Sequence, residues 1–287
     1  MGAEQLQLTV GPYQFDAVAW GPAEGAPVLL LHGFPESSWA WRFIQPPLAD
    51  AGYRSVAPDL RGYSPGARPP EASAFAIEAL VDDVFGLADA LGWERFHLVG
   101  HDWGGVAAWH AAGREPERIL TLTVVATPHP RALQAARDGG PGDDGDDQAA
   151  KSAYLEFFRA PGAEDAFLAD DGAVLLAGLQ GTGMAAADAA HYVARAATPE
   201  AMVGMLNWYR GADPTDAAKV GPVTSPTMYV YPDADTVFGP TAAGATAAEV
   251  DGPYRYEVLD GVSHWAPEEA ADDVVTLLLE HLADAPA

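Results

Sequence analysis

The chain has no cysteine, and this absence excludes several kinds of chemistry at once. Disulfide bonds, thiolate metal sites and a cysteine nucleophile are all ruled out, so any nucleophile must be another residue type. Basic residues are also scarce, since Lys and Arg number 15 against 41 Asp and Glu, a formal charge of −26. A surface with this charge repels phosphate backbones and anionic lipid, so we expect neither nucleic-acid nor membrane partners.

Long apolar runs are missing as well. No stretch approaches the roughly 20 apolar residues that a membrane-spanning helix needs. Residues 1–10 lack the basic segment and apolar segment of a secretory signal, so the sequence predicts a cytoplasmic protein. The 287 residues, 49% of them hydrophobic, are enough for one large α/β domain or a core domain with an insertion. Length does not decide between a monomer and a homodimer.

Short β-type runs alternate with helical periodicity through most of the chain. This alternation predicts an α/β fold, in which a mostly parallel sheet of eight strands is covered by helices on both faces. The expected strands are 5–10, 13–20, 28–31, 54–58, 96–99, 120–125, 226–231 and 254–259. The expected core helices are 39–51, 75–91, 106–112 and 268–283.

The pattern changes after Thr127-Pro128. Residues 154–209 show short helical patterns only, and strand-like sequence resumes at 226. We therefore predict a helical cap at 129–218, inserted into a core formed by 1–128 and 219–287. Ligands of open α/β sheets bind at the carboxyl ends of the strands, and the cap would cover that edge. The Gly/Asp run at 138–147 predicts a mobile loop, without the ordered ligand spacing of a calcium loop.

A strand, a sharp turn and a helix meet around Asp102. The β-type run 96–99 leads into Gly-His-Asp-Trp-Gly-Gly at 100–105, which matches the nucleophile elbow G-x-S-x-G except that Asp replaces Ser. An aspartate is already ionised at neutral pH and needs no activating base. It suits displacement at a saturated carbon, which leaves an alkyl ester on Asp102. The alternative is that Asp102 only caps the following helix.

Two backbone amides are candidates for an oxyanion hole. The strand 28–31 runs directly into His-Gly-Phe-Pro at 32–35. In this type of fold that loop supplies one N–H and the residue after the nucleophile supplies another, here Phe34 and Trp103. These donors would stabilise the tetrahedral intermediate when water attacks the ester, and one donor is typically worth about 3 kcal/mol.

The acid and the histidine that would act together with Asp102 follow the insertion in chain order. Asp233 and Asp235 come after the strand 226–231, and His264 comes after the strand 254–259. The order nucleophile, acid, histidine is that of α/β-hydrolases. His264 would be the general base for water, and its partner carboxylate would fix the tautomer. We choose Asp235 over Asp233, because the helix-initiating Pro240 follows it five residues later.

Several motifs together carry a family resemblance. They are His-Gly-Phe-Pro-Glu-Ser at 32–37, Asp-Leu-Arg-Gly-Tyr-Ser at 59–64, the elbow at 100–105, Asn-Trp-Tyr-Arg at 207–210, the stretch 235–240 and His-Trp at 264–265. In this order and over nearly the whole chain, the sequence resembles the soluble epoxide hydrolase family of the α/β-hydrolase fold.

The resemblance implies an enzyme that converts epoxides to vicinal diols without a cofactor or metal. Asp102, Asp235 and His264 then match the family's nucleophile, acid and histidine. An epoxide oxygen leaves as an alkoxide and needs a proton donor, and the family's two cap tyrosines match Tyr154 and Tyr209. The substrates would be water and a small apolar epoxide, bound by Pro35, Trp103, Phe157, Trp208 and Trp265.

Two other functions stay open at this point. A haloalkane dehalogenase uses the same Asp–His–Asp chemistry, but such enzymes usually carry a polar residue where this chain has Phe34, and they need no paired tyrosines. A small-molecule binding protein could use the same fold without turnover, and it would give at most one equivalent of product. An esterase is disfavoured because no serine occupies the elbow.

Overall fold

A computed structural model describes residues 2–141 and 145–285 of the chain. Its centre is an eight-stranded sheet with the strand order β1-β2-β4-β3-β5-β6-β7-β8. The β1–β2 and β2–β4 pairs are antiparallel, and the other neighbouring strands are parallel. The strands are β1 (Glu4–Val10), β2 (Tyr13–Trp20), β3 (Ala26–Leu31), β4 (Tyr53–Pro58), β5 (Phe96–His101), β6 (Ile119–Val125), β7 (Thr227–Pro232) and β8 (Tyr254–Leu259). The predicted mostly parallel α/β sheet is confirmed.

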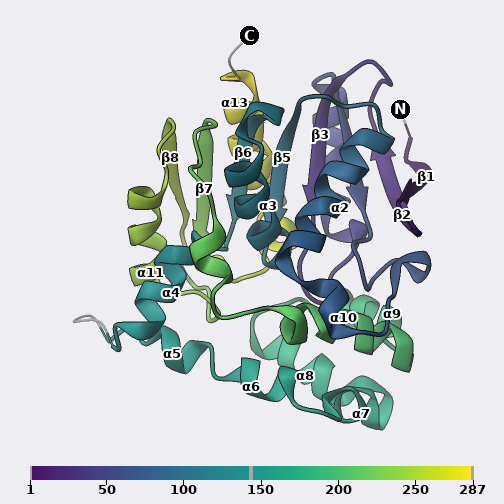
Figure 1. Ribbon diagram of the computed structural model, residues 1–287, viewed down its shortest axis with the longest axis vertical. Helices are drawn as coiled ribbons and strands as arrows, with labels where there is room; N and C mark the ends of the chain where they lie inside the picture. The colour runs from purple at the N-terminus through teal and green to yellow at the C-terminus, as the bar shows by residue number, and fades with distance from the viewer. Residues whose placement is uncertain (1, 142–144, 286–287) are drawn as a thin grey trace.

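Helices cover both faces of the sheet, as the sequence predicts. Leu29 and Leu31 of β3 pack in one apolar core with α2 (Ile77–Ala90) and α3 (Trp103–Arg114). Val28 and Leu30 of the same strand point the other way, into a second core with α1 (Gln45–Asp50) and α13 (Ala271–Ala283). In Figure 1, α2 and α3 lie in front of the sheet and α13 lies behind it. The alternating sides of β3 therefore build two cores from one apolar run.

Two of the predicted helices are interrupted. The segment expected as one helix at 39–51 is a 3-10 turn, η1 (Ser38–Trp41), followed by the short α1. Pro46 and Pro47 explain the break, because proline has no N–H and is tolerated only in the first turn of a helix. The closing segment 268–283 divides into α12 (Ala266–Glu269) and α13 at Ala270, which has φ −126° and ψ 38°. One continuous helix was the wrong prediction in both places.

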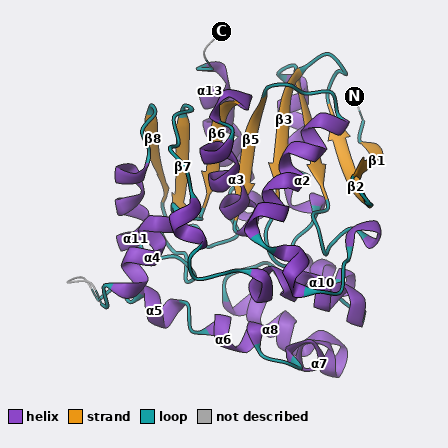
Figure 2. Cartoon of the chain, viewed as in Figure 1, coloured by secondary structure: helices purple, strands orange, loops and turns teal. Residues whose placement is uncertain are grey.

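A layer of helices joins β6 to β7 and lies at one end of the sheet. Figure 2 shows the arrowheads of the parallel strands pointing toward this layer. Its helices are α4 (Pro130–Asp138), α5 (Gln148–Lys151), α6 (Tyr154–Arg159), α7 (Ala163–Leu168), α8 (Ala173–Gly181), α9 (Ala186–Arg195) and α10 (Pro199–Gly211). The chain returns to the sheet in β7, and α11 (Pro240–Ala245) follows that strand. Of the predicted mobile loop at 138–147, residues 142–144 lie outside the described residues.

Among residues 2–141 and 145–285, no helix has both the length and the apolar character needed to cross a membrane.

Candidate active site

Asp102 stands on a strained turn between β5 and α3. Its backbone has φ 48° and ψ −119°, a region that non-glycine residues rarely adopt. Glycines on both sides allow the turn, since a Cβ on Gly104 would lie 2.2 Å from the carbonyl oxygen of Leu31 and one on Gly100 would lie 2.4 Å from that of Gly104. The side chain accepts no hydrogen bond from the first turn of α3, so the alternative of a helix cap is wrong.

The loop after β3 brings a backbone donor to this carboxylate. The Phe34 N–H donates to Oδ1 of Asp102 at 2.8 Å. The approach requires glycine at position 33, because a Cβ there would lie 2.3 Å from Cβ of Asp102. The Phe34–Pro35 peptide bond that follows is cis. Trp103, the other predicted donor, supplies the first amide of α3.

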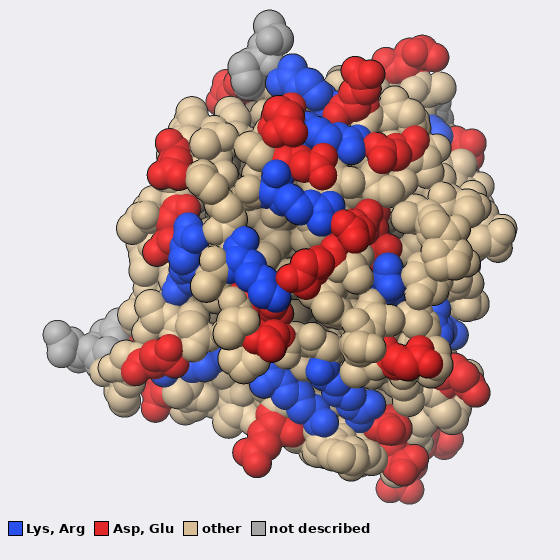
Figure 3. Space-filling model, in the orientation of Figure 1, with Lys and Arg blue, Asp and Glu red and all other residues tan. Residues whose placement is uncertain are grey.

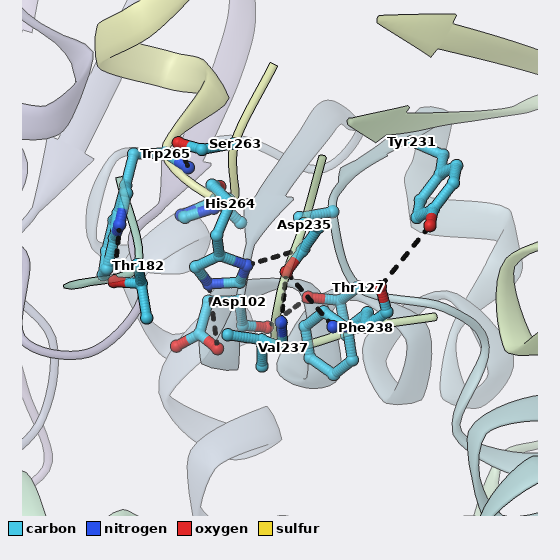
Figure 4. A network of polar contacts seen from close by, with 12 residues as sticks. Asp102, Thr127, Thr182, Tyr231, Asp235, Val237, Phe238, Ser263, His264 and Trp265 are labelled. Atoms are coloured by element: carbon cyan, nitrogen blue, oxygen red, sulfur yellow. Dashed lines mark hydrogen bonds and ion pairs between the residues drawn. The ribbon is translucent and has the colours of Figure 1, made fainter. Parts of the chain in front are cut away.

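His264 lies between two carboxylates (Figure 4). Its Nδ1 is 2.8 Å from Oδ2 of Asp235, and its Nε2 is 3.7 Å from Oδ2 of Asp102. Asp235 is held by the N–H groups of Val237 and Phe238, which donate to its Oδ1 at 2.6 and 3.1 Å. With both backbone donors on one oxygen, the other is left to accept the Nδ1 proton of His264, which places Nε2 toward Asp102.

The competing Asp233 is engaged elsewhere. Its Oδ1 accepts a hydrogen bond from the N–H of Gly261 at 2.6 Å on the exposed side of the sheet edge. Of the two aspartates after β7, the structure therefore brings only Asp235 to His264.

The charges of this cluster stabilise one another. Burial alone would raise the pKa of Asp102, but the nearby positive charge of His264 and the N–H of Phe34 hold that pKa below its ordinary value. Burial alone would lower the pKa of His264, but the carboxylates of Asp235 and Asp102 raise it well above its ordinary value. An ionised Asp102 and a protonated His264 thus favour each other in the resting protein.

Tyr154 of α6 and Tyr209 of α10 lie in the helical layer across from Asp102. The ring of Tyr209 makes edge contacts with Trp103 and Phe34, with ring centroids 5.1 and 5.3 Å apart. Burial, and next the negative charge of Asp102, raise the pKa of both phenols above the ordinary value. Both hydroxyls therefore stay protonated at neutral pH and can donate a hydrogen bond or a proton.

Two cavities meet at these residues, and both are lined by Asp102, Tyr154 and Tyr209. The apolar cavity, of about 430 Å³, is further lined by Phe34, Phe157, Phe158, Phe167, Leu175, Leu179, His264 and Trp265. The second cavity, of about 210 Å³, also has a mainly apolar lining, which includes Phe75, Leu80, Leu133, Trp103 and Trp208. We call it the polar cavity because it is lined as well by Gln134, Arg137, Arg159, Asp213 and Asp216. Of the predicted substrate-binding residues, Trp103, Phe157, Trp208 and Trp265 lie on a cavity, whereas Pro35 lines neither.

A second buried pair lies behind His264, and sequence reasoning missed it. His101 has its Nδ1 2.9 Å from Oε2 of Glu36 and its Nε2 2.9 Å from the carbonyl oxygen of His264. Both ring nitrogens thus face acceptors. Glu36 and His101 belong to the motifs at 32–37 and 100–105, but the sequence gives no sign that they touch. The pair fixes the backbone that carries His264.

Metal binding needs several ligand side chains close together. In the described part of the chain, no group of three His, Asp or Glu side chains is arranged to hold a metal ion.

Proteins of known family are similar to this chain over most of its length. Residues 26–271 match the family of the alpha/beta hydrolase fold. Epoxide hydrolase A of Mycobacterium tuberculosis is 33% identical over 90% of this chain and 91% of its own length. The chain belongs to the epoxide hydrolase family of the α/β-hydrolase fold. The family resemblance read from the sequence is confirmed, and the chain is a hydrolase.

Other members of this epoxide hydrolase family show the same breadth of similarity. Epoxide hydrolase 4 of Homo sapiens is 31% identical over 94% of this chain and 76% of its own. The crystal structure of epoxide hydrolase A from Mycobacterium thermoresistibile superposes with a TM-score of 0.84 at 27% identity, and the match covers 99% of each chain. The similarity therefore includes the helical layer as well as the sheet.

Proposed function

We propose that this chain converts epoxides to vicinal diols through a covalent ester on Asp102. One observation carries the proposal, namely that an ionised carboxylate and two protonated phenols line the same cavities. Oδ1 of Asp102 is held by the Phe34 N–H, and Oδ2 is left to attack a ring carbon. The carbon–oxygen bond of the ring breaks, and the leaving oxygen takes a proton from Tyr154 or Tyr209.

The second step hydrolyses the ester. Once Asp102 is alkylated it carries no charge, so one of the two carboxylates that raise the pKa of His264 is lost. We infer that His264 then gives up its proton, which restores the tyrosine phenol, and becomes a neutral base. Neutral His264 takes a proton from water, and the resulting hydroxide attacks the ester carbonyl. The N–H groups of Phe34 and Trp103 hold the oxyanion until the bond to the diol oxygen breaks. That oxygen takes the proton of the newly formed Asp102 carboxyl group, so the diol leaves with Asp102 ionised and His264 protonated as at the start.

Residues 129–218 form the cap in this proposal, and 1–128 with 219–287 form the core. The cap supplies the tyrosines, while the core supplies Asp102, Asp235 and His264. Trp103, Phe157, Trp208 and Trp265 would contact a small apolar epoxide in the two cavities. The chemistry needs water as its only other reactant, and no cofactor or metal.

The proposal is tested by trapping the intermediate. With styrene oxide, we expect multiple turnovers by the unaltered chain and accumulation of an ester in His264→Gln, seen by mass spectrometry as a gain equal to the mass of the epoxide. The double variant Asp102→Ala/His264→Gln is the matched control and should show no gain. A His264→Gln protein that remains unmodified in the presence of styrene oxide would exclude the two-step route. Multiple turnover also excludes a binding protein without catalysis.

A further inference from the structure

Two arginines of the helical layer have no acidic partner, although acidic residues outnumber basic ones 41 to 15. Most basic side chains elsewhere pair with a carboxylate, and Arg210, next to Tyr209, pairs with Glu164. Arg137 of α4 and Arg159 of α6 pair with none in the described part of the chain. On the face shown in Figure 3, basic side chains lie over this helical layer and also over the upper part of the molecule, where they stand beside acidic ones. Among the described residues, Arg68, Arg95 and Lys151 also form no ion pair, but Arg137 and Arg159 line the same cavity.

Both arginines line the polar cavity together with the predicted reactive groups. Nε of Arg137 is buried and has no hydrogen-bond partner among the described residues. Nε of Arg159 donates to the carbonyl oxygen of Tyr209 at 2.9 Å, which holds the guanidinium beside α10. Burial, and next the charge of Arg159, lower the pKa of Arg137. An anion bound between the two guanidinium groups would offset the burial of the Arg137 charge and the repulsion between the two arginines.

The acidic side chains near this cavity already have partners. Asp213 accepts hydrogen bonds from Thr215, and Asp216 pairs with Lys219 at 2.8 Å. Asp138, next to Arg137 in sequence, accepts from Gln134 at 2.8 Å. None of the three forms an ion pair with Arg137 or Arg159. The described residues therefore supply no counter-charge to these two guanidinium groups.

We propose that the polar cavity is a subsite for a carboxylate, so that the preferred substrate is an epoxide bearing a carboxylate on a short arm. This inference rests on the proposed epoxide hydrolysis at Asp102. The arm would extend from the reacting ring toward Arg137 and Arg159, and the rest of the substrate would occupy the apolar cavity. The polar cavity, at about 210 Å³, is smaller than the roughly 300 Å³ at the low end for drug-sized ligands, which limits the arm to a few atoms.

The arginines could instead act on the acidity of Tyr154. Their charges oppose the rise in the pKa of that phenol, which burial and Asp102 cause. Such an effect would alter the opening of every epoxide, whether charged or neutral. An anion subsite would alter only the charged one. A matched pair of substrates therefore separates the two roles.

The experiment compares 5,6-epoxy-6-phenylhexanoate with its neutral primary amide. We expect the unaltered chain to show the higher kcat/KM for the acid, and Arg137→Gln to lower the acid-to-amide ratio by about tenfold. Arg137→Lys should keep much of the ratio, because it keeps the charge. Arg95→Gln is the control for losing one positive charge, since Arg95 is exposed and has no ion pair among the described residues.

Binding of the two products supplies a readout that does not depend on turnover. The dihydroxy acid should bind more tightly than the dihydroxy amide by calorimetry, and Arg137→Gln should remove that difference. Equal loss of activity on acid and amide in Arg137→Gln, or equal binding of the two diols, would overturn the anion subsite. Failure of the proposed function would give a different result. In that case the epoxy acid, the epoxy amide and styrene oxide would all remain unhydrolysed.

Discussion

At the scale of single residues, the charge on Asp102 controls the proton on His264. The pKa of His264 is raised because two carboxylates outweigh its burial, and only Asp235 remains when Asp102 is neutral. We expect Asp102→Asn to lower the pKa of His264, so that the imidazole loses its proton at a lower pH than in the unaltered chain. Titration of the imidazole signals by NMR measures this directly, with His264→Gln identifying the signal. An unchanged or higher pKa in Asp102→Asn would contradict the proposed switch from acid to base.

The phenol of Tyr209 is predicted to act only when a ring opens. General acids contribute typically about 10²- to 10⁴-fold, so in the His264→Gln background Tyr209→Phe should slow ester formation from styrene oxide by about 10²-fold. Tyr154→Phe should give a loss in the same direction. Tyr192→Phe is the matched control, because its cap hydroxyl donates to Glu268 and lines neither cavity. Equal rates of ester formation in the Tyr209 and Tyr192 variants would remove Tyr209 from the mechanism.

At the scale of elements, the turn between β5 and α3 depends on the close approach of backbones. A methyl group at position 104 would overlap the carbonyl of Leu31, so β3 and α3 would have to separate. We expect Gly104→Ala to lower the free energy of unfolding by about 1–3 kcal/mol, the usual cost of overpacking. Gly244→Ala is the control, since Gly244 lies on the exposed side of α11 with nothing within 4 Å and should gain about 0.5–1 kcal/mol. Urea unfolding followed by circular dichroism compares them, and equal stability of the two variants would argue against a tight elbow.

Elements were predictable from the sequence wherever local pattern decides the structure. The apolar runs of β3 and β5 predict buried strands, and the glycines around Asp102 predict a sharp turn. The strands and the turn are all present. The interruption at Pro46-Pro47 follows from the missing proline N–H groups, although the helical periodicity of 39–51 predicts one helix. Contacts between distant segments were not readable. Glu36 meets His101 across 65 positions, and the cavity position of Arg137 depends on how α4 and α6 dock on the core.

At the scale of the whole molecule, the helical layer is fastened to the core by polar contacts around the sheet edge. Arg195 of α9 pairs with Asp59, and Arg42 of the core pairs with Asp188 at 2.8 Å. The Trp208 indole N–H of α10 donates to the carbonyl of Arg61 at 2.7 Å, and Arg61 itself pairs with Asp83. These contacts set the distance between Asp102 and the phenols of Tyr154 and Tyr209. The geometry of the site therefore depends on the interface between the helical layer and the core.

The net charge of −26 opposes this compact arrangement. Salt weakens the ion pairs between the helical layer and the core. It also screens repulsion among the acidic side chains that form no ion pair, and these are the majority of the acidic side chains in the described residues. We therefore expect the melting temperature to rise by a few degrees as NaCl increases from about 0.05 to 0.5 M, where the screening length falls from above ~10 Å to well below it. Choline chloride at matched ionic strength separates screening from specific sodium binding, because only screening predicts the same rise in both salts. A melting temperature that falls with either salt would mean that the ion pairs joining cap and core contribute more to stability than the repulsion takes away.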